Sequence, residues 1–345
     1  MKYLLYHGHL VVDDKREFLD GALLIEDDKI SDVFLHSSKI PPIEDCMPID
    51  LGGLLLMPGF FDSHVYGSDG LVFDTADKQE FDQISAALLK KGTTTFLAAL
   101  TGDPGGEKLY KQLHLLNDYV SPNARFGGVY LVGPFLSRSY PGTLKTENFC
   151  APDLELTKSF LKECGCIRAM SIAYELPGAE KTGRYLHEQG IKVMCGHSEA
   201  VAGDLDENVD GFSHLFEAMR PLDHHEETLV NCAFENRWPF ELAADGKDIA
   251  DNVLHLVLRS IDQEWLMLVS GDRGEPAVID EMKVLYRLGG KYCDLLQFSG
   301  LNAYRFYGLD ERFGTLQKGK YSDIVIMDDD LDIRRVMCGG KFYDV

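Results

Sequence analysis

Two histidines stand at the ends of similar segments and have the chemistry to bind a metal ion. The stretches Val193-Met-Cys-Gly-His197 and Gly211-Phe-Ser-His214 are each typical of a short buried strand that ends in a histidine. We expect a helical stretch to follow each histidine. Side chains at the carboxyl ends of parallel strands point into the region where α/β proteins bind ligands. Imidazole nitrogens from two successive strands can hold one divalent ion, so the pattern predicts a metal site.

A purely structural interpretation of these histidines stays open. Polar residues are common at strand ends, and a single histidine there is more often an ordinary polar residue than a ligand. In that case His197 and His214 bind nothing, and mutating either one changes only the stability of the protein. The repeated strand-to-histidine context makes the two interpretations about equal, and the rest of the chain has to decide between them.

The composition narrows the classes of partner. The chain of 345 residues has a formal net charge of −22 and 45% hydrophobic residues, enough for one large core and a smaller second one. Nucleic acids and anionic membrane surfaces require a basic footprint, so the charge argues against both. No apolar stretch approaches ~18 residues, and the first residues lack the features of a signal peptide. We therefore expect a cytoplasmic protein that acts on a small molecule.

The eight cysteines are scattered along the chain. Only Cys164-Gly-Cys166 is closely spaced, and no further cysteine or histidine follows at the spacing of a structural zinc site. A chain of this size does not need disulfides to fold. We predict reduced thiols, which agrees with a cytoplasmic location.

Short strands dominate both ends of the chain, and strands alternate with helices between them. Residues 1–56 contain several short strands separated by turns, and residues 309–345 return to hairpin-like strands. Residues 54–62 are typical of one long apolar strand. From there to about residue 308, amphipathic segments separate eight predicted barrel strands, at 58–62, 94–99, 126–132, 169–173, 192–195, 211–213, 240–243 and 266–269.

Eight strands with intervening helices in ~250 residues are typical of an α/β fold of the (β/α)8 TIM barrel type. We predict that this barrel spans 57–308 and carries the site. Neither terminal segment has enough apolar surface to fold alone. We therefore predict that 1–56 and 309–345 form one small β-sandwich domain, split between the two ends of the chain.

The order of short motifs resembles the amidohydrolase superfamily and, in finer pattern, the N-acetylglucosamine-6-phosphate deacetylase family. The matching motifs run along nearly the whole chain in the family's order, and they include Met57-Pro-Gly-Phe-Phe-Asp-Ser-His64, Gly133-Pro-Phe-Leu136, Gly196-His-Ser198, His214-Leu-Phe216, Ala244-Asp-Gly246 and Gly314-Thr-Leu-Gln-Lys-Gly-Lys320. The resemblance implies a metal-dependent hydrolase that removes acetate from an N-acetyl amino sugar phosphate. It also implies a homodimer.

The resemblance assigns metal-site roles to individual positions. His197 and His214 match the family's two histidine ligands, and His64 matches the first histidine of the His-x-His pair in members with a second metal. The family's metal-binding glutamate precedes Gly-Pro-Phe, where this chain has Val132. The implied cofactor is one divalent ion, zinc or iron. The nearest candidate for a substitute carboxylate is Glu217, which would lie one helical turn after His214. A glutamate early in a helix more often faces solvent, and His64, Asp245 and Asp248 are further candidate ligands.

The catalytic and substrate positions also depart from the family pattern. The catalytic aspartate should directly follow the last strand, where Gly271 stands, and Asp272 comes one residue late. Asp272 is therefore either the catalytic group in a shifted loop or a residue that caps a helix. Leu144 replaces a histidine that contacts substrate in the family. The predicted substrate-binding residues are Glu217, Ala218, His225 and Asp248.

These substitutions leave three hypotheses. The chain is a working hydrolase of the family, a member of the same fold that has lost catalysis and serves as a binding or regulatory protein, or a fold whose histidines bind nothing. A catalyst predicts that His197→Ala abolishes metal content and turnover. A binding protein predicts saturable ligand binding without turnover.

Overall fold

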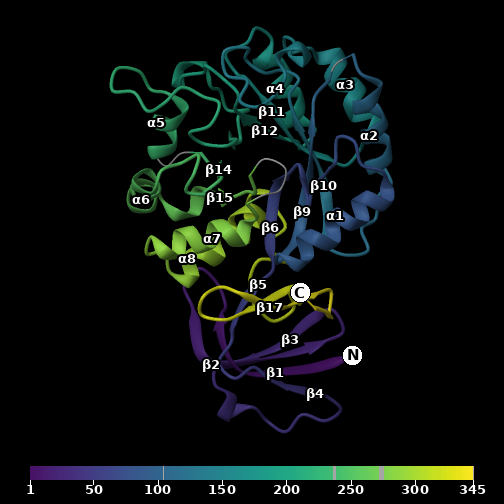
Figure 1. Ribbon diagram of the computed structural model, residues 1–345, viewed down its shortest axis with the longest axis vertical. Helices are drawn as coiled ribbons and strands as arrows, with labels where there is room; N and C mark the ends of the chain where they lie inside the picture. Colours follow the sequence, from purple (N-terminus) through teal and green to yellow (C-terminus); the bar gives the residue numbers. More distant parts are fainter. Residues whose placement is uncertain (104, 236–237, 272–275, 345) are drawn as a thin grey trace.

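The structure is a computed structural model that describes residues 1–345 except 104, 236–237, 272–275 and 345. Two β-sheets organise it, and Figure 1 shows a helix-surrounded upper part above a lower part made of strands. Within the described residues, no helix is long and apolar enough to cross a bilayer.

The larger part is a barrel of parallel strands in the order β15-β14-β13-β12-β11-β10-β9-β6. The strands are β6 (Phe60–Val65), β9 (Thr93–Thr101), β10 (Arg125–Val132), β11 (Ile167–Ile172), β12 (Lys192–Cys195), β13 (Gly211–Phe212), β14 (Phe240–Leu242) and β15 (Leu266–Leu268). A small hairpin, β7 (Gly67–Ser68) and β8 (Leu71–Val72), follows β6. Each of the eight barrel strands overlaps a strand predicted from the sequence, and the predicted (β/α)8 barrel is confirmed.

Helices separate most of the barrel strands along the chain. They are α1 (Lys78–Lys90), α2 (Glu107–Asn117), α3 (Leu154–Glu163), α4 (Ala179–Glu188), α5 (Leu229–Phe234), α6 (Asp251–Ser260), α7 (Val278–Arg287), α8 (Tyr292–Leu296) and α9 (Asn302–Phe306), with a π-helical turn, Gln297–Leu301, between the last two. The start of α1 shows why a helix begins there. The Asp77 side chain accepts hydrogen bonds from the backbone N–H groups of Gln79 and Glu80. In turn, the Glu80 side chain accepts a hydrogen bond from the backbone N–H of Asp77.

The second sheet combines strands from both ends of the chain. Its order is β18-β17-β16-β5-β1-β2-β3, with β4 also paired to β1. The strands are β1 (Lys2–Val11), β2 (Glu17–Glu26), β3 (Lys29–Phe34), β4 (Met47–Asp50), β5 (Leu55–Pro58), β16 (Ile324–Met327), β17 (Ile333–Cys338) and β18 (Lys341–Asp344). Both termini lie in this lower part (Figure 1). A domain formed by the two chain ends is confirmed, whereas the boundaries at 56 and 309 stay a prediction.

The long strand predicted at 54–62 is two strands. β5 pairs with β16 in the terminal sheet, and β6 pairs with β9 in the barrel. Gly59 stands between them, where a Cβ atom would lie 2.2 Å from Oγ1 of Thr94. The chain passes so close to β9 here that only glycine fits. This break starts β6 in the barrel and so sets the position of His64.

Candidate metal centre

His64 lies on β6 and its side chain is fully buried. Its backbone N–H donates to Oδ1 of Asp62 at 3.1 Å, and Oδ2 of Asp62 accepts from the N–H of Ser270 at 3.2 Å. Asp62 therefore ties β6 to the chain that leaves β15. The ring of His64 packs against the ring of Tyr130, with centroids 4.1 Å apart, which restricts the orientation of the imidazole.

Glu241 points into the barrel from β14 and is also fully buried. Its Oε2 lies 2.8 Å from Nδ1 of His64, and its Oε1 accepts a hydrogen bond from Oγ of Ser63 at 3.0 Å. A charged side chain inside an apolar strand requires partners of this kind, because an isolated buried carboxylate is costly. Two polar residues of β6 therefore hold the Glu241 carboxylate in place.

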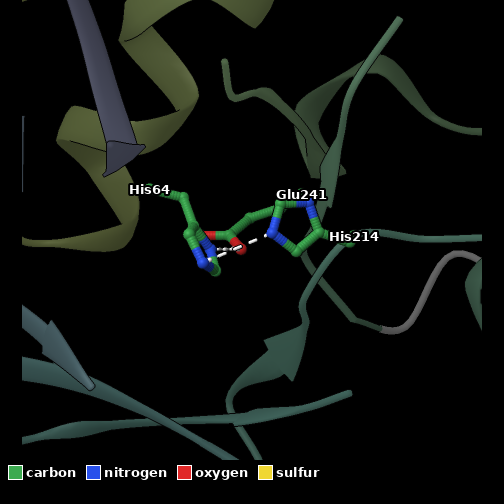
Figure 2. Close-up of side chains that lie close together, drawn as sticks. All are labelled: His64, His214 and Glu241. Atoms are coloured by element: carbon green, nitrogen blue, oxygen red, sulfur yellow. Dashed lines mark hydrogen bonds and ion pairs between the residues drawn. The ribbon is translucent and has the colours of Figure 1, made fainter. Parts of the chain in front are cut away.

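His214 completes a group of three. It follows β13, and the N–H of the next residue, Leu215, donates to the carbonyl oxygen of Glu241 at 2.8 Å. Its Nε2 lies 3.3 Å from Nε2 of His64. Figure 2 shows the two imidazoles and the carboxylate turned toward one another. One ligand atom from each of the three residues lies within 4.8 Å of the others, and all three residues are buried.

Burial governs the electrostatics of this group. It raises the pKa of Glu241 to about 7, although His214, Ser63 and Tyr130 act in the opposite direction. Burial likewise raises the pKa of Asp62 to about 6, against the hydrogen bonds from Ser270 and His64. A divalent cation would offset this cost, because it stabilises a carboxylate that burial otherwise disfavours.

The donor set fits a divalent metal ion. Two imidazoles and one carboxylate are the protein ligands of a common class of catalytic zinc sites, which keep a fourth position open. Two ligands at about 2.1 Å from a tetrahedral ion lie roughly 3.4 Å apart, and the two Nε2 atoms are separated by 3.3 Å. The group can therefore hold one divalent ion, whose identity the donor set does not fix.

The structure pairs His214 with a different histidine from the one first expected. Among the described residues, the metal-compatible group comprises His64, His214 and Glu241, and it does not include His197. His197 follows β12 and is 8% exposed. Its Nδ1 lies 3.2 Å from the carbonyl oxygen of Tyr140. The role of His197 as a metal ligand stays a prediction.

The helical stretches expected after the two histidines are absent, and that expectation was wrong. Turns and bends follow both residues, with only a 3-10 turn at Ala202–Asp204, and the next α-helix after His214 is α5. His197, His214, Phe216 and Ala218 have φ values between 44° and 78°, in the left-handed region that a right-handed helix cannot use. The N–H of Glu217 donates to the carbonyl oxygen of His214 at 2.9 Å. A turn rather than a helix therefore joins the two residues, and Glu217 as a substitute ligand stays a prediction.

The structure does not gather the predicted substrate residues into one cluster. Ala218 uses its carbonyl oxygen to accept from the N–H of Ser198 at 3.1 Å. His225 is exposed beside His224, and Asp248 is exposed in a turn where its N–H donates to Asp245. Asp272, the predicted catalytic residue, lies outside the described residues. The roles of all these residues, and of Glu217, stay predictions.

A cavity of about 440 Å³ opens where β9 and β10 end, and Val132 and Leu144 both line it. These are the two positions at which the resemblance implies a metal-binding glutamate and a substrate histidine. Val132 is 1% exposed and belongs to an apolar cluster. No carboxylate can therefore reach a metal from this position of β10. Charged residues of both signs line the same cavity: Lys108, Lys145, Asp74, Asp103 and Glu147.

Sequence reasoning missed Glu241. The signal was a single glutamate inside Phe240-Glu-Leu-Ala-Ala, where every other position is apolar. Side chains along a barrel strand point alternately inward and outward, so the sequence alone leaves open which face such a residue occupies. A charged residue among buried apolar ones favours a functional role for the position, but the partner of Glu241 comes from β6, 177 positions earlier in the chain.

Comparison with known proteins agrees with the fold. The sequence model of the amidohydrolase family matches residues 187–343. The N-acetylglucosamine-6-phosphate deacetylase of Bacillus subtilis is 24% identical and aligns over 98% of this chain and 96% of its own length. The Bos taurus protein of the same name is 25% identical over 85% of this chain and 84% of its own. The crystal structure of the Mycobacterium smegmatis N-acetyl-D-glucosamine-6-phosphate deacetylase has a TM-score of 0.88, is 25% identical and covers 99% of both chains.

The (β/α)8 barrel, the terminal sheet domain and the histidine and carboxylate group inside the barrel agree with the match to the amidohydrolase family model. Over most of its length, the chain is similar to the N-acetylglucosamine-6-phosphate deacetylases.

Proposed function

We propose that this protein is a metal-dependent hydrolase that removes the acetyl group from an N-acetylated amino sugar phosphate. The observation that carries the proposal is the convergence of His64, His214 and Glu241 inside the barrel, within 4.8 Å of one another. The names of the relatives supply the substrate class. Zinc and iron are the ions we propose, since both accept imidazole and carboxylate ligands.

In this proposal, different residues bind the metal, position its ligands and transfer the proton. His64, His214 and Glu241 hold the ion, and Ser63 and Tyr130 fix the positions of Glu241 and His64. A divalent ion in this position polarises an amide carbonyl as a Lewis acid. We propose Asp272 as the group that carries the proton from water to the departing amine, first as a base and then as an acid.

We propose that the 440 Å³ cavity beside β9 and β10 holds the part of the substrate that lies away from the metal, since His64, His214 and Glu241 are not among its lining residues. The cavity opens at the carboxyl ends of the strands, which is the end where TIM barrels bind substrate. The proposal requires Lys108 and Lys145 to contact the phosphate directly, because three acidic residues, Asp74, Asp103 and Glu147, also line the cavity. The apolar side chains of Val132 and Leu144 would exclude water from one wall. A cytoplasmic location and a homodimeric state remain predictions.

The direct test is acetate release from N-acetylglucosamine 6-phosphate by the purified protein, supplied in turn with zinc and with ferrous iron. We expect turnover that depends on the metal and that His214→Ala abolishes. His114→Ala is the matched control, because this histidine is 72% exposed on α2 and lies outside the group. The control should leave the rate unchanged.

The outcomes separate the hypotheses. Saturable binding of the sugar phosphate without acetate release, with either metal, would contradict the proposal and favour a binding or regulatory protein. Acetate release that survives His214→Ala would instead show that the catalytic centre lies elsewhere in the barrel. Hydrolysis of N-acetylglucosamine and its 6-phosphate at equal rates would contradict the phosphate part of the proposal.

A further inference from the structure

The opposite end of the barrel contains a second cavity of about 440 Å³ with different chemistry. Arg125 is the first residue of β10, Arg168 the second of β11, and Lys192 the first of β12. All three line the cavity, together with Arg312 from the segment that leads to β16. Parallel strands bring their amino ends to the same side of the barrel. The cavity therefore lies at the end opposite to the one where Val132 ends β10.

The cavity has the opposite charge to the whole protein. The chain has a net charge of −22, yet the described residues that line the cavity include four cations and no carboxylate. We call Arg125, Arg168, Lys192 and Arg312 the basal cations. Four like charges repel one another, so their gathering requires either compensation by acidic neighbours or an anionic ligand.

Acidic neighbours compensate two of the basal cations. Arg125 forms an ion pair with Asp323 at 3.2 Å, and Lys192 forms one with Asp210 at 2.8 Å. Arg168 and Arg312 are exposed, and neither forms an ion pair with a carboxylate in the described part of the chain. About two positive charges at the cavity therefore lack a counter-charge from the protein.

The floor of the cavity is built from packed aromatic rings. Phe313 stacks on Tyr321 with centroids 4.8 Å apart and on Tyr304 with centroids 5.3 Å apart. The Arg125 guanidinium lies over Phe313 at 4.7 Å, which holds this arginine by cation–π contact as well as by Asp323. The cations therefore surround a fixed wall, and the cavity is within the size range of small-molecule sites.

We propose that the basal cations bind a small phosphate monoester at this end of the barrel. A guanidinium group presents N–H donors in a planar fork that matches two phosphate oxygens. Arg168 and Arg312 supply two such forks, and a phosphate monoester carries about two negative charges at neutral pH, which matches the uncompensated charge. The aromatic floor would contact the organic part of the ligand. This proposal stands apart from the proposed deacetylation and does not rest on it.

The test is calorimetric titration of the full-length protein with glucose 6-phosphate at low ionic strength, with inorganic phosphate and glucose as comparison ligands. We expect saturable binding of the first, weaker binding of the second and none of the third. The double variant Arg168→Glu/Arg312→Glu should bind glucose 6-phosphate at least about tenfold more weakly, since each lost fork removes charge-assisted bonds. Added salt should weaken binding by the wild type.

Arg259→Glu provides the matched control, because this arginine is exposed at the end of α6 and does not line the cavity. Titration of the His214→Ala variant separates the two ends of the barrel, and binding there should be unchanged. Absence of saturable binding by the wild type would overturn the proposal. Equal binding by the double variant, or loss of binding only in His214→Ala, would place the ligand elsewhere and would also overturn it. The single substitutions Arg168→Gln and Arg312→Gln, which remove the charge without reversing it, repeat the test if the double variant is unstable.

Discussion

Two sides of the same barrel differ in chemistry. On one side, β6, β13 and β14 bring two imidazoles and a carboxylate together in a buried polar group. On the other side, β10 ends in Val132, which packs in an apolar cluster. The resemblance to the deacetylases places the metal-binding glutamate on β10, whereas the structure has its carboxylate on β14. A ligand missing from one strand can therefore be supplied by another, because every strand of a barrel has side chains that point inward.

The largest expected effect comes from placing a carboxylate on the apolar side. We expect Val132→Glu to lower the free energy of unfolding by about 3 kcal/mol, because it buries an unpaired charge among apolar side chains. Chemical denaturation without metal measures this, with Val120→Glu as the control, since Val120 is 86% exposed. Unchanged stability together with tighter metal binding would show that β10 belongs to the metal site.

A smaller effect concerns the strand that carries His64. We expect Gly59→Ala to lower the free energy of unfolding by about 2 kcal/mol, because the added methyl group meets Thr94 at 2.2 Å and β6 must shift. Gly203→Ala is the control, since nothing lies within 4 Å of the Cβ position there. Thermal unfolding compares the two variants. Equal melting temperatures would mean that the chain at Gly59, between β5 and β6, is not tightly packed.

The smallest effect we predict is on metal affinity, from loss of the hydrogen bond that Ser63 donates to Glu241. Ser63→Ala removes the 3.0 Å hydrogen bond to Glu241 but none of the three proposed ligands. We expect metal affinity to fall by about tenfold, as is common when a residue that orients a ligand is lost. Competition with a chelator measures the affinity, and Ser260→Ala, an exposed serine on α6, is the control. A loss as complete as that of His214→Ala would imply that Ser63 is itself a ligand.

Local patterns in the sequence predicted the barrel but only part of the candidate site. Apolar runs separated by amphipathic segments were enough to predict all eight strands. Strand ends pointed to His197 and His214, and the family resemblance pointed to His64. The pairing of His214 with His64 depends on how strands far apart in sequence meet across the barrel, which no local pattern encodes. Glu241 was missed for the same reason. The helix predicted after His214 failed because tertiary contacts hold His214, Phe216 and Ala218 at positive φ.

The metal content of the purified protein is the most direct test of a metal site formed by β6, β13 and β14. After incubation with zinc and removal of excess ion, elemental analysis should find about one ion per chain in the wild type and in Glu207→Gln, an exposed control. Glu241→Gln, which keeps the size of the side chain and removes its charge, should lose the ion, as should His214→Ala. A wild type that binds no metal, or a Glu241→Gln variant that retains a full complement, would contradict the account of a metal site shared by β6, β13 and β14.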